Sequence, residues 1–168
     1  DYYLMIHLKM TGQLVYKNKA ALIAGGHPII NQNKKLPNKF TRVIFKLNDK
    51  SALYFNDVRR FGWIKLATRD KFIELNNQLG VEPLGPGFTL KYFNEFLRRK
   101  LKSRIKQALL DQKHISGVGN IYADEALFAA RIHPTIPARK VKNPAALWQH
   151  AVDIMARSMI SGGISIID

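Results

Sequence analysis

Cysteine is absent from the 168-residue sequence, which excludes disulfide bonds and thiolate zinc sites. The five histidines are widely scattered, and none has the i, i+4 spacing that is typical of metal ligands. Apolar runs are far shorter than the roughly 18 residues that a membrane-spanning helix needs. A basic segment leading into an apolar one, the mark of a signal peptide, does not occur at the start. We therefore expect no metal site in this chain, no membrane association and a cytoplasmic location.

Acidic residues are few. The sequence has 12 Asp and Glu against 27 Lys and Arg, which gives a formal net charge of +15. Such a surplus favours a polyanionic partner, because binding releases the counterions of the polyanion. Nucleic acid fits best, and an anionic membrane surface is the alternative, although it would need a basic helix with a broad apolar face. With 46% hydrophobic residues, the chain can bury the core of one domain or of two small ones.

The first half of the sequence has strand patterns. Residues 3–16 alternate between apolar and polar side chains, with a break at Thr11-Gly12. Residues 17–39 are polar and contain Gly25-Gly26, Pro28 and Pro37, which predicts a long surface loop. Further strands are predicted at residues 41–47, 52–56 and 62–67, with a hairpin turn at Asn48-Asp49. The first half is therefore predicted to be an antiparallel meander.

The second half has helical patterns separated by Gly and Pro. A punctuated linker at residues 83–87 suggests a boundary between a β domain, residues 1–85, and an all-helical domain, residues 86–168. The predicted fold class is accordingly α+β. Helix signals are found at residues 70–79, after a Thr89 cap, from Ser103, at residues 121–130, and from Asn143-Pro144 to Gly162-Gly163.

A Gly-rich turn, Gly117-Val118-Gly119, follows an apolar helix and leads into a second helix. We predict Asn120 as the N-cap of that helix, with the first backbone N–H groups facing an anion. A GxG turn by itself is often only a tight connection between packed helices. Here it follows a basic stretch that includes Lys102 and Lys106, which favours a phosphate of nucleic acid. Such a site would fix the register of the strand without reading its bases.

A second candidate is the segment Asn56-Asp57-Val58-Arg59-Arg60-Phe61-Gly62. The guanidinium of Arg59 can reach base edges or phosphates, and Phe61 or Met10 can act as an apolar wedge in a base stack. The alternative is structural: Met10 and Phe61 belong to the core, and Asp57 pairs with an arginine. Glu82 is a lone carboxylate, which is more typical of a structural role than of a general acid. The sequence contains no P-loop, no Ser/His/Asp set and no paired carboxylates.

Five motifs occur together: His7-Leu8-Lys9-Met10, residues 57–62, Gly80-Val81-Glu82-Pro83-Leu84, residues 106–122, and Ile132-His133-Pro134. In this order and spacing they resemble the formamidopyrimidine-DNA glycosylase family, bacterial base-excision enzymes that remove 8-oxoguanine and ring-opened purines. The resemblance implies an antiparallel β-sandwich portion followed by an all-helical helix–two-turn–helix domain. It also implies a monomer, associated with the nucleoid, that binds double-stranded DNA with an oxidised purine in a basic cleft.

The same resemblance implies roles for single residues. Met10, Arg59 and Phe61 would fill the gap left when the damaged nucleotide is flipped out, which offsets part of the cost of unstacking. Arg59 would also face the orphaned cytosine. Lys106, Gly119 and Asn120 fall on the element that grips phosphates, and Lys102 lies just before it in the sequence.

The sequence also departs from the family pattern. Catalysis in the family belongs to an N-terminal proline, a glutamate and a lysine, which have no counterpart here, and the nitrogen of an internal proline is an amide. We therefore expect no catalytic residue in this chain, which would be an internal, inactive fragment of a glycosylase and AP lyase. The four-cysteine zinc finger of the family is missing, so no cofactor is expected here, although full-length members usually bind one structural zinc. Asp168 interrupts the loop after Gly162-Gly163 that cradles the flipped base.

Two other functions fit the same residues. The chain could be a free-standing, non-catalytic nucleic-acid module that uses the same helix pair. It could also belong to the endonuclease VIII branch, which prefers oxidised pyrimidines, although the pattern Arg59-Arg60-Phe61 argues against that branch.

Overall fold

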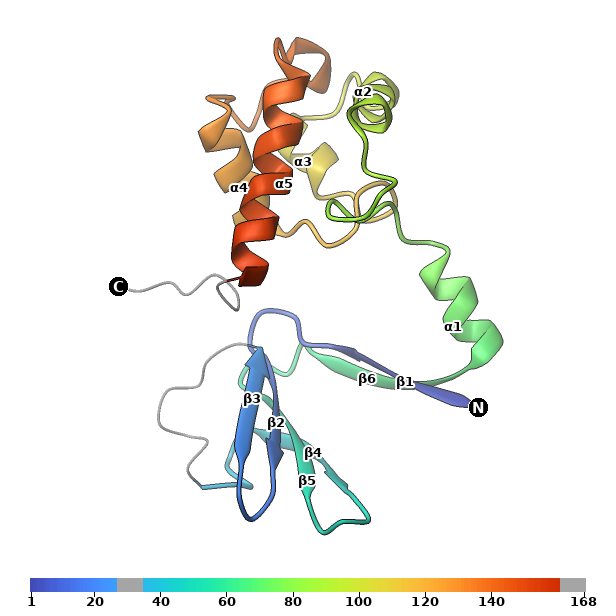
Figure 1. Ribbon diagram of the computed structural model, residues 1–168, viewed down its shortest axis with the longest axis vertical. Coiled ribbons are helices and arrows are strands. Elements are labelled where there is room, and N and C mark those ends of the chain that lie inside the picture. Colours follow the sequence, from blue (N-terminus) through green and yellow to red (C-terminus); the bar gives the residue numbers. More distant parts are fainter. Residues whose placement is uncertain (27–34, 161–168) are drawn as a thin grey trace. The chain divides into compact units, whose positions relative to one another are not determined.

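The computed structural model describes residues 1–26 and 35–160, which fall into two compact units, Asp1–Ile73 and Glu74–Asp168. The first, the strand unit, contains all six strands, and the second, the helical unit, contains α2 to α5 (Figure 1). The predicted α+β class is confirmed.

The strands are β1 Tyr2–His7, β2 Gly12–Lys17, β3 Leu22–Gly26, β4 Thr41–Lys46, β5 Ala52–Asp57 and β6 Trp63–Thr68. The helices are α1 Arg69–Asn76, α2 Leu90–Arg99, α3 Ile105–Leu109, α4 Asn120–Ala129, the 3-10 helix η1 Ala138–Lys140 and α5 Pro144–Ile160.

The strand unit has two antiparallel sheets, one with the order β3-β2-β5-β4 and one made of β1 and β6. The hairpin at Asn48-Asp49 between β4 and β5 is confirmed, but the prediction of a simple meander was wrong, because β2 pairs with β5. At the predicted break the chain leaves one sheet and enters the other, and Gly12 N–H donates to the carbonyl of Leu8 at 2.9 Å. A Cβ on Gly12 would collide with that carbonyl, so only glycine fits this bend.

The predicted surface loop over residues 17–39 was wrong for its first part. Residues Leu22–Gly26 form β3, which pairs with β2 in the register Lys17 with Leu22. The turn between them is closed by Asn18, whose Oδ1 accepts from the N–H groups of Ala20 and Ala21 at 2.8 and 2.6 Å. Every residue of β3 is exposed, which explains why no alternation of apolar and polar residues marked this edge strand in the sequence.

The helical unit has one hydrophobic core, to which α2, α3, α4 and α5 all contribute. Thr89 caps α2 as predicted, with its Oγ1 accepting from Tyr92 N–H at 3.1 Å. The helical spacing of the apolar residues after Thr89 and after Ser103 predicts one buried face for each helix, and the structure confirms both. The buried residues are Phe93, Phe96 and Leu97 of α2 and Ile105, Ala108 and Leu109 of α3. The predicted start of α5 is confirmed as well, whereas its predicted end at Gly162-Gly163 lies outside the described residues. The most deeply buried side chains include Phe93, Phe96, Ile105, Leu109, Leu127 and Leu147.

The boundary between the units lies at Ile73 and Glu74, earlier than the predicted boundary at residues 85 and 86. The reason is a short extended segment around Val81. Its N–H donates to the carbonyl of His114 at 3.0 Å, and its carbonyl accepts from Ser116 N–H at 3.1 Å. These bonds form an isolated parallel bridge between Val81 and Ile115, which attaches the segment before α2 to the helical unit.

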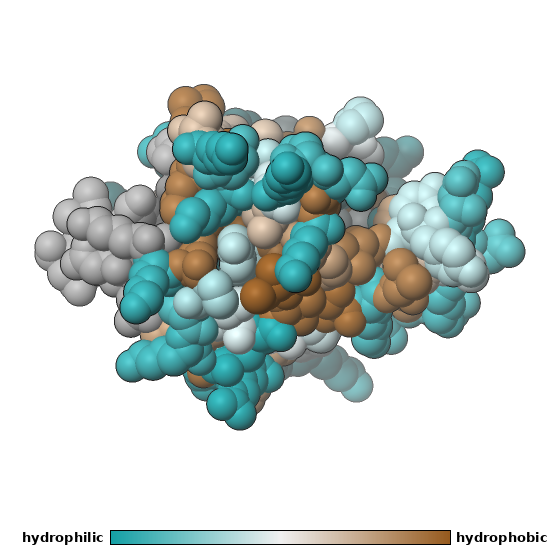
Figure 2. All heavy atoms as spheres, turned by 90° about the horizontal axis from the view of Figure 1, so that it is seen from below, coloured by the Kyte–Doolittle hydropathy of each residue, from teal (hydrophilic) through white to brown (hydrophobic). Residues whose placement is uncertain are grey.

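Apolar side chains also reach the surface. On the face shown in Figure 2, hydrophobic side chains lie exposed among hydrophilic ones. In the sheet of β1 and β6, Leu4 and Leu66 form a cross-strand pair and are 45% and 68% exposed. On the opposite face of β1, the ring of Tyr3 stacks on that of Phe72 of α1, with the two centroids 4.5 Å apart. Among the described residues, no helix is both long and apolar enough to cross a membrane.

The cap of α2 gives a first prediction. Replacing Thr89 with alanine removes the acceptor for the first-turn N–H, so the free energy of unfolding of the helical unit should fall by about 1 kcal/mol. Urea denaturation followed by the fluorescence of Trp148, which lies in this unit, measures the change. Thr89→Ser keeps the oxygen and should stay within a few tenths of a kcal/mol of the parent. Equal losses in both variants would show that the methyl group matters and the cap does not.

Candidate nucleic-acid interface

Met10, Arg59 and Phe61, which are distant in the sequence, meet on the surface of the strand unit. One guanidinium nitrogen of Arg59 lies 3.5 Å from the sulfur of Met10, and its carbon lies 4.8 Å from the centre of the Phe61 ring. Met10 is 70% exposed and Phe61 is 58% exposed. Neither side chain is part of the core, so the structural alternative for them was wrong. We call these three residues the wedge cluster.

The loop that carries the wedge cluster is organised by one buried carboxylate. Asp57, at the end of β5, is 1% exposed. One of its oxygens accepts from the Thr11 hydroxyl at 2.5 Å and from Arg59 N–H at 3.2 Å, and the other accepts from Gly62 N–H at 2.7 Å. The Thr11 hydroxyl in turn accepts from Arg59 N–H at 3.1 Å. These bonds tie both ends of the Asp57–Gly62 turn to the bend after Met10.

Asp57 does not pair with an arginine side chain through its carboxylate, as the structural alternative supposed. Arg42 contacts the backbone of Asp57 instead, with its Nε donating to the Asp57 carbonyl at 2.9 Å. Burial by itself raises the pKa of Asp57, but the hydrogen bonds that it accepts outweigh this effect and hold its pKa below the ordinary value of 3.8. The donors are the Thr11 hydroxyl and the backbone N–H groups of Gly62, Arg59 and Arg60.

The Gly-rich turn of the helical unit, residues 117–119, is fixed by core packing and by hydrogen bonds. Ile115 and Val118 are buried in the core, while Gly117 has a φ of +82°, a value that favours glycine. Gln112 clamps the turn from one side: its Oε1 accepts from Gly117 N–H at 2.8 Å, and its Nε2 donates to the carbonyl of Val118 at 2.7 Å. The turn therefore presents a fixed backbone to solvent. The sequence interpretation missed the clamp, because a single glutamine carries no pattern.

The prediction that Asn120 is the N-cap was wrong by one residue. The cap is Gly119, whose backbone is extended, with φ −98° and ψ −179°, and Asn120 is the first residue of α4. The carbonyl of Gly119 accepts from Ala123 N–H at 3.0 Å. No side chain among the described residues caps this helix, and both Gly119 and Asn120 are exposed. The first N–H groups of α4 are therefore more open to an external anion than the sequence interpretation supposed.

The two predicted lysines differ in their surroundings. Lys106, on α3, makes an ion pair with Asp124 of α4 across 2.8 Å. Lys102 lies in the exposed turn before α3. Lys102, Lys106, Gly119 and Asn120 thus all belong to the helical unit, whereas the wedge cluster belongs to the strand unit. The structure brings the wedge cluster together, and the ion pair with Asp124 places Lys106 beside α4. Lys102 lies elsewhere in the helical unit, because the carbonyls of its neighbours Leu101 and Ser103 accept from the N–H groups of Arg139 and Ala138.

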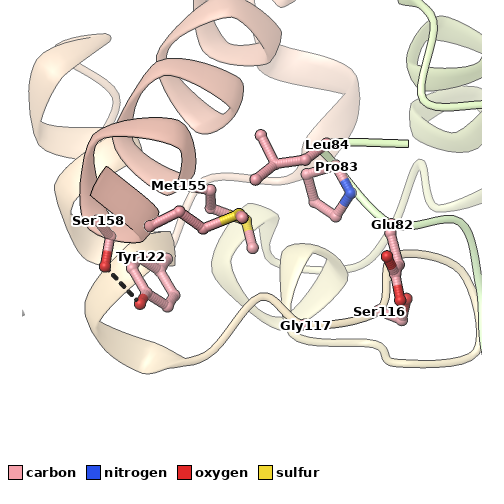
Figure 3. A pocket seen from close by; sticks show the side chains of 9 residues that line it. Glu82, Pro83, Leu84, Ser116, Gly117, Tyr122, Met155 and Ser158 are labelled. Carbon is pink, nitrogen blue, oxygen red and sulfur yellow. Dashed lines mark hydrogen bonds between the residues drawn. The ribbon is translucent and has the colours of Figure 1, made fainter. Parts of the chain in front are cut away.

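A pocket of about 360 Å³ opens in the helical unit between the Val81 segment, the Gly-rich turn and the end of α5. Glu82 and Ser116 lie on one side of it and Tyr122 and Ser158 on the other, with Met155 between them (Figure 3). The hydroxyls of Tyr122 and Ser158 are 2.8 Å apart. The pocket thus has an apolar floor, a carboxylate and a hydroxyl pair. Glu82, for which the sequence favours a structural role, lines this pocket.

The described residues contain no group of three or more His, Asp or Glu side chains that could hold a metal ion, and the sequence has no cysteine. The residues present therefore do not fit the four-cysteine zinc site that the resemblance implies for full-length family members.

Comparison with protein families decides the relationship. The family model of the formamidopyrimidine-DNA glycosylase H2TH domain matches residues 79–168, and that of the N-terminal domain matches residues 1–64. The chain belongs to the formamidopyrimidine-DNA glycosylase family. Curated relatives agree: it is 38% identical to the enzyme of that name from Wolbachia sp. subsp. Drosophila simulans and 40% identical to the one from Pelotomaculum thermopropionicum, over 98% and 99% of this chain.

Solved structures of family members have the same fold. A complex of Lactococcus lactis Fpg with DNA containing an abasic site matches 99% of this chain and 57% of its own, with a TM-score of 0.80 and 30% identity. The MutM (Fpg) protein of Thermus thermophilus matches 99% of this chain and 56% of its own, with a TM-score of 0.78 and 33% identity. The chain spans 56% of the length of the two curated glycosylases.

The buried carboxylate gives a second prediction. Asp57→Asn keeps the shape but places an NH₂ group or a weaker acceptor opposite N–H donors, so the free energy of unfolding at neutral pH should fall by about 1–3 kcal/mol. A lowered pKa stabilises the fold above pH 3.8 and ceases to do so as the pH falls through the folded-state value.

The difference between parent and Asp57→Asn should therefore shrink as the pH is lowered through this range, which denaturation at a series of pH values measures. Asp70→Asn, on the exposed α1, serves as the control. A difference that stays constant down to the lowest pH would contradict the charged role of Asp57.

Proposed function

We propose that this chain forms the DNA-binding part of a base-excision glycosylase that removes 8-oxoguanine and formamidopyrimidines from duplex DNA. The wedge cluster is the observation that carries the proposal. A thioether and a phenyl ring are held in contact with a guanidinium and remain largely exposed, which is unfavourable in water unless a partner covers them. A duplex with one nucleotide extruded offers such a cover.

The wedge cluster can offset the cost of extruding a base. Removing a nucleotide from the stack costs a few kcal/mol, and an apolar side chain that enters the gap recovers part of it. Phe61 and Met10 provide the apolar surface, while the donors of Arg59 can pair with the acceptors of the base left unpaired, a cytosine in the proposed substrate. The Asp57 bonds fix the backbone beneath these side chains, so little order has to be gained on binding.

The start of α4 provides the contact with the phosphate backbone of the DNA. Its uncapped N–H groups and the positive end of the helix dipole attract a phosphate, and Lys106, which is joined to α4 by its ion pair with Asp124, adds a cation beside this helix. Contacts of this kind set the position of the strand without selecting its sequence. The related Fpg of Lactococcus lactis forms a complex with DNA that contains an abasic site, which supports DNA as the partner of this chain.

The pocket at Glu82 is suited to the extruded base. Its volume of about 360 Å³ matches a small heterocycle, and the ring of Tyr122 and the sulfur of Met155 offer apolar contact. The carboxylate of Glu82 can accept hydrogen bonds from the N–H groups of a purine. We propose that the glycosidic bond is cleaved outside this pocket by a terminal secondary amine, with AP lyase activity following from the same covalent intermediate. The parent protein is proposed to act as a monomer in the nucleoid.

Two variants test the two parts of the proposal, the wedge and the phosphate contact. Phe61→Ala removes a wedge and should weaken binding to a duplex with 8-oxoguanine opposite cytosine about tenfold, while binding to undamaged duplex stays nearly unchanged. Asn120→Ala, at the open helix start, should weaken binding to both duplexes by a similar factor. Fluorescence anisotropy with labelled duplexes at several salt concentrations measures both effects, and affinity should fall steeply with salt for both duplexes.

Three outcomes would contradict the proposed DNA binding. A loss that is equal for both duplexes in Phe61→Ala would remove the wedge role. A loss confined to the lesion duplex in Asn120→Ala would contradict a pure phosphate contact. A flat salt dependence would contradict binding through phosphates altogether.

A further prediction concerns the chemistry of the 168-residue chain itself. In the family the Schiff base with C1′ of the sugar is formed by the free secondary amine of an N-terminal proline, whereas the nitrogen of each of the seven prolines in this sequence is an amide. Sodium borohydride should therefore trap no covalent adduct between this chain and 8-oxoguanine DNA. A trapped band on a denaturing gel would show that another amine of the chain takes part.

A further inference from the structure

A second group of cations lies in the helical unit, away from the start of α4. Arg98 and Arg99 form the last turn of α2, and Arg139, Lys140 and Lys142 lie in or just after η1. All five side chains are exposed, and within residues 35–160 none of them makes an ion pair with a carboxylate. We call these five residues the distal basic cluster.

The two segments of the cluster are fixed side by side by backbone bonds. Ala138 N–H donates to the carbonyl of Ser103 at 2.9 Å, and Arg139 N–H donates to that of Leu101 at 3.4 Å. Between them runs an open groove of about 240 Å³, whose polar lining residues are Asn94, Arg98 and Arg139. Its apolar lining residues are Leu97, Leu101, Ala138, Val141 and Pro144. The charges are thus held on a defined surface and are not spread over a loop.

The dipole of α2 explains only part of this arrangement. Cations in the last turn of a helix are favourable beside its free carbonyl groups, which accounts for Arg98 and Arg99. It does not account for Arg139, Lys140 and Lys142, which add three like charges to the same surface. Concentrating five cations costs repulsion, and a polyanion that binds there relieves it.

The distal basic cluster lies at the opposite end of the helical unit from Asn120. Tyr122, in the first turn of α4, contacts Ser158 near the end of α5, whereas Pro144, at the beginning of α5, lines the groove. From Pro144 to Ser158 the helix rises by about 21 Å. In Figure 1, α2 and the beginning of α5 accordingly lie at one end of this unit, and the start of α4 lies at the other.

We propose that the distal basic cluster binds the phosphate backbone of a second DNA duplex. The N–H groups at the start of α4 point out of the other end of the unit, because N–H groups of a helix point toward its start. A duplex is stiff over this distance, with a persistence length of about 50 nm, so one that is gripped at Asn120 does not curve around the unit to reach Arg139. The chain would then hold two duplex segments at once and could pass from one to the other during a search.

The proposal rests on the proposed DNA binding, and a bridging experiment separates the two. The 168-residue chain is mixed with donor-labelled and acceptor-labelled short duplexes, and energy transfer between them reports bridging. Arg98→Glu combined with Arg139→Glu should lower bridging about tenfold at low salt, while anisotropy shows that the first duplex still binds within about twofold. The control, Lys19→Glu combined with Lys46→Glu, makes the same change in net charge on exposed residues of the strand unit and should leave bridging nearly intact.

Several results would overturn the proposal. They are the absence of bridging by the parent chain, unchanged bridging in the Arg98/Arg139 variant, and an equal loss in the control pair. Sedimentation that shows two protein molecules in each bridged complex would assign bridging to a dimer instead. If the parent chain binds no duplex at all, the proposed function fails together with this inference. If it binds a single duplex, only this inference fails.

Discussion

An α-helix cannot satisfy its own first backbone N–H groups, and the helical unit presents one such helix start, that of α4, to solvent. Holding it open requires a rigid support. Ile115 and Val118 anchor the Gly-rich turn in the core, and Gln112 fixes the backbone of that turn on its outer side. With no side chain at the cap, the N–H groups remain available to an external anion. The packing of the unit therefore determines where a phosphate can bind.

The strand unit also pairs backbone N–H groups with an anion, but there the anion is a side chain of the protein itself. At Asp57 a carboxylate of the chain itself collects the N–H groups of a tight turn, and the turn becomes a fixed platform for Arg59 and Phe61. One site is closed by an internal anion and the other is left open to an external one. This difference explains why the first positions side chains, whereas the second is suited to binding a ligand.

Much of this could be predicted from the sequence, because local signals carried it. The Thr89 cap and the apolar stripe of Phe93 and Phe96 are short-range patterns, and the structure contains both. The order of the strands could not be predicted, since pairing of β2 with β5 depends on contacts between residues about 40 positions apart. The exposure of Met10 and Phe61 could not be predicted either, because residue type alone does not distinguish an apolar wedge from a core residue. Asp57, which organises their loop, belongs to a segment that the sequence singles out. Its hydrogen-bond partners could not be predicted, because most of them are backbone N–H groups, which have no sequence signature.

The ion pair between Lys106 and Asp124 has a consequence for the thermodynamics of binding. A lysine in solution is surrounded by mobile ions, and a DNA phosphate that it neutralises sheds its own condensed cations into the bulk. Lys106 already carries a tethered counterion, so a phosphate that approaches it competes with a carboxylate that cannot diffuse away. In the proposed complex with DNA, this ion pair would therefore reduce the net attraction between Lys106 and a phosphate. Asp124 would compete with the DNA for the same ammonium group.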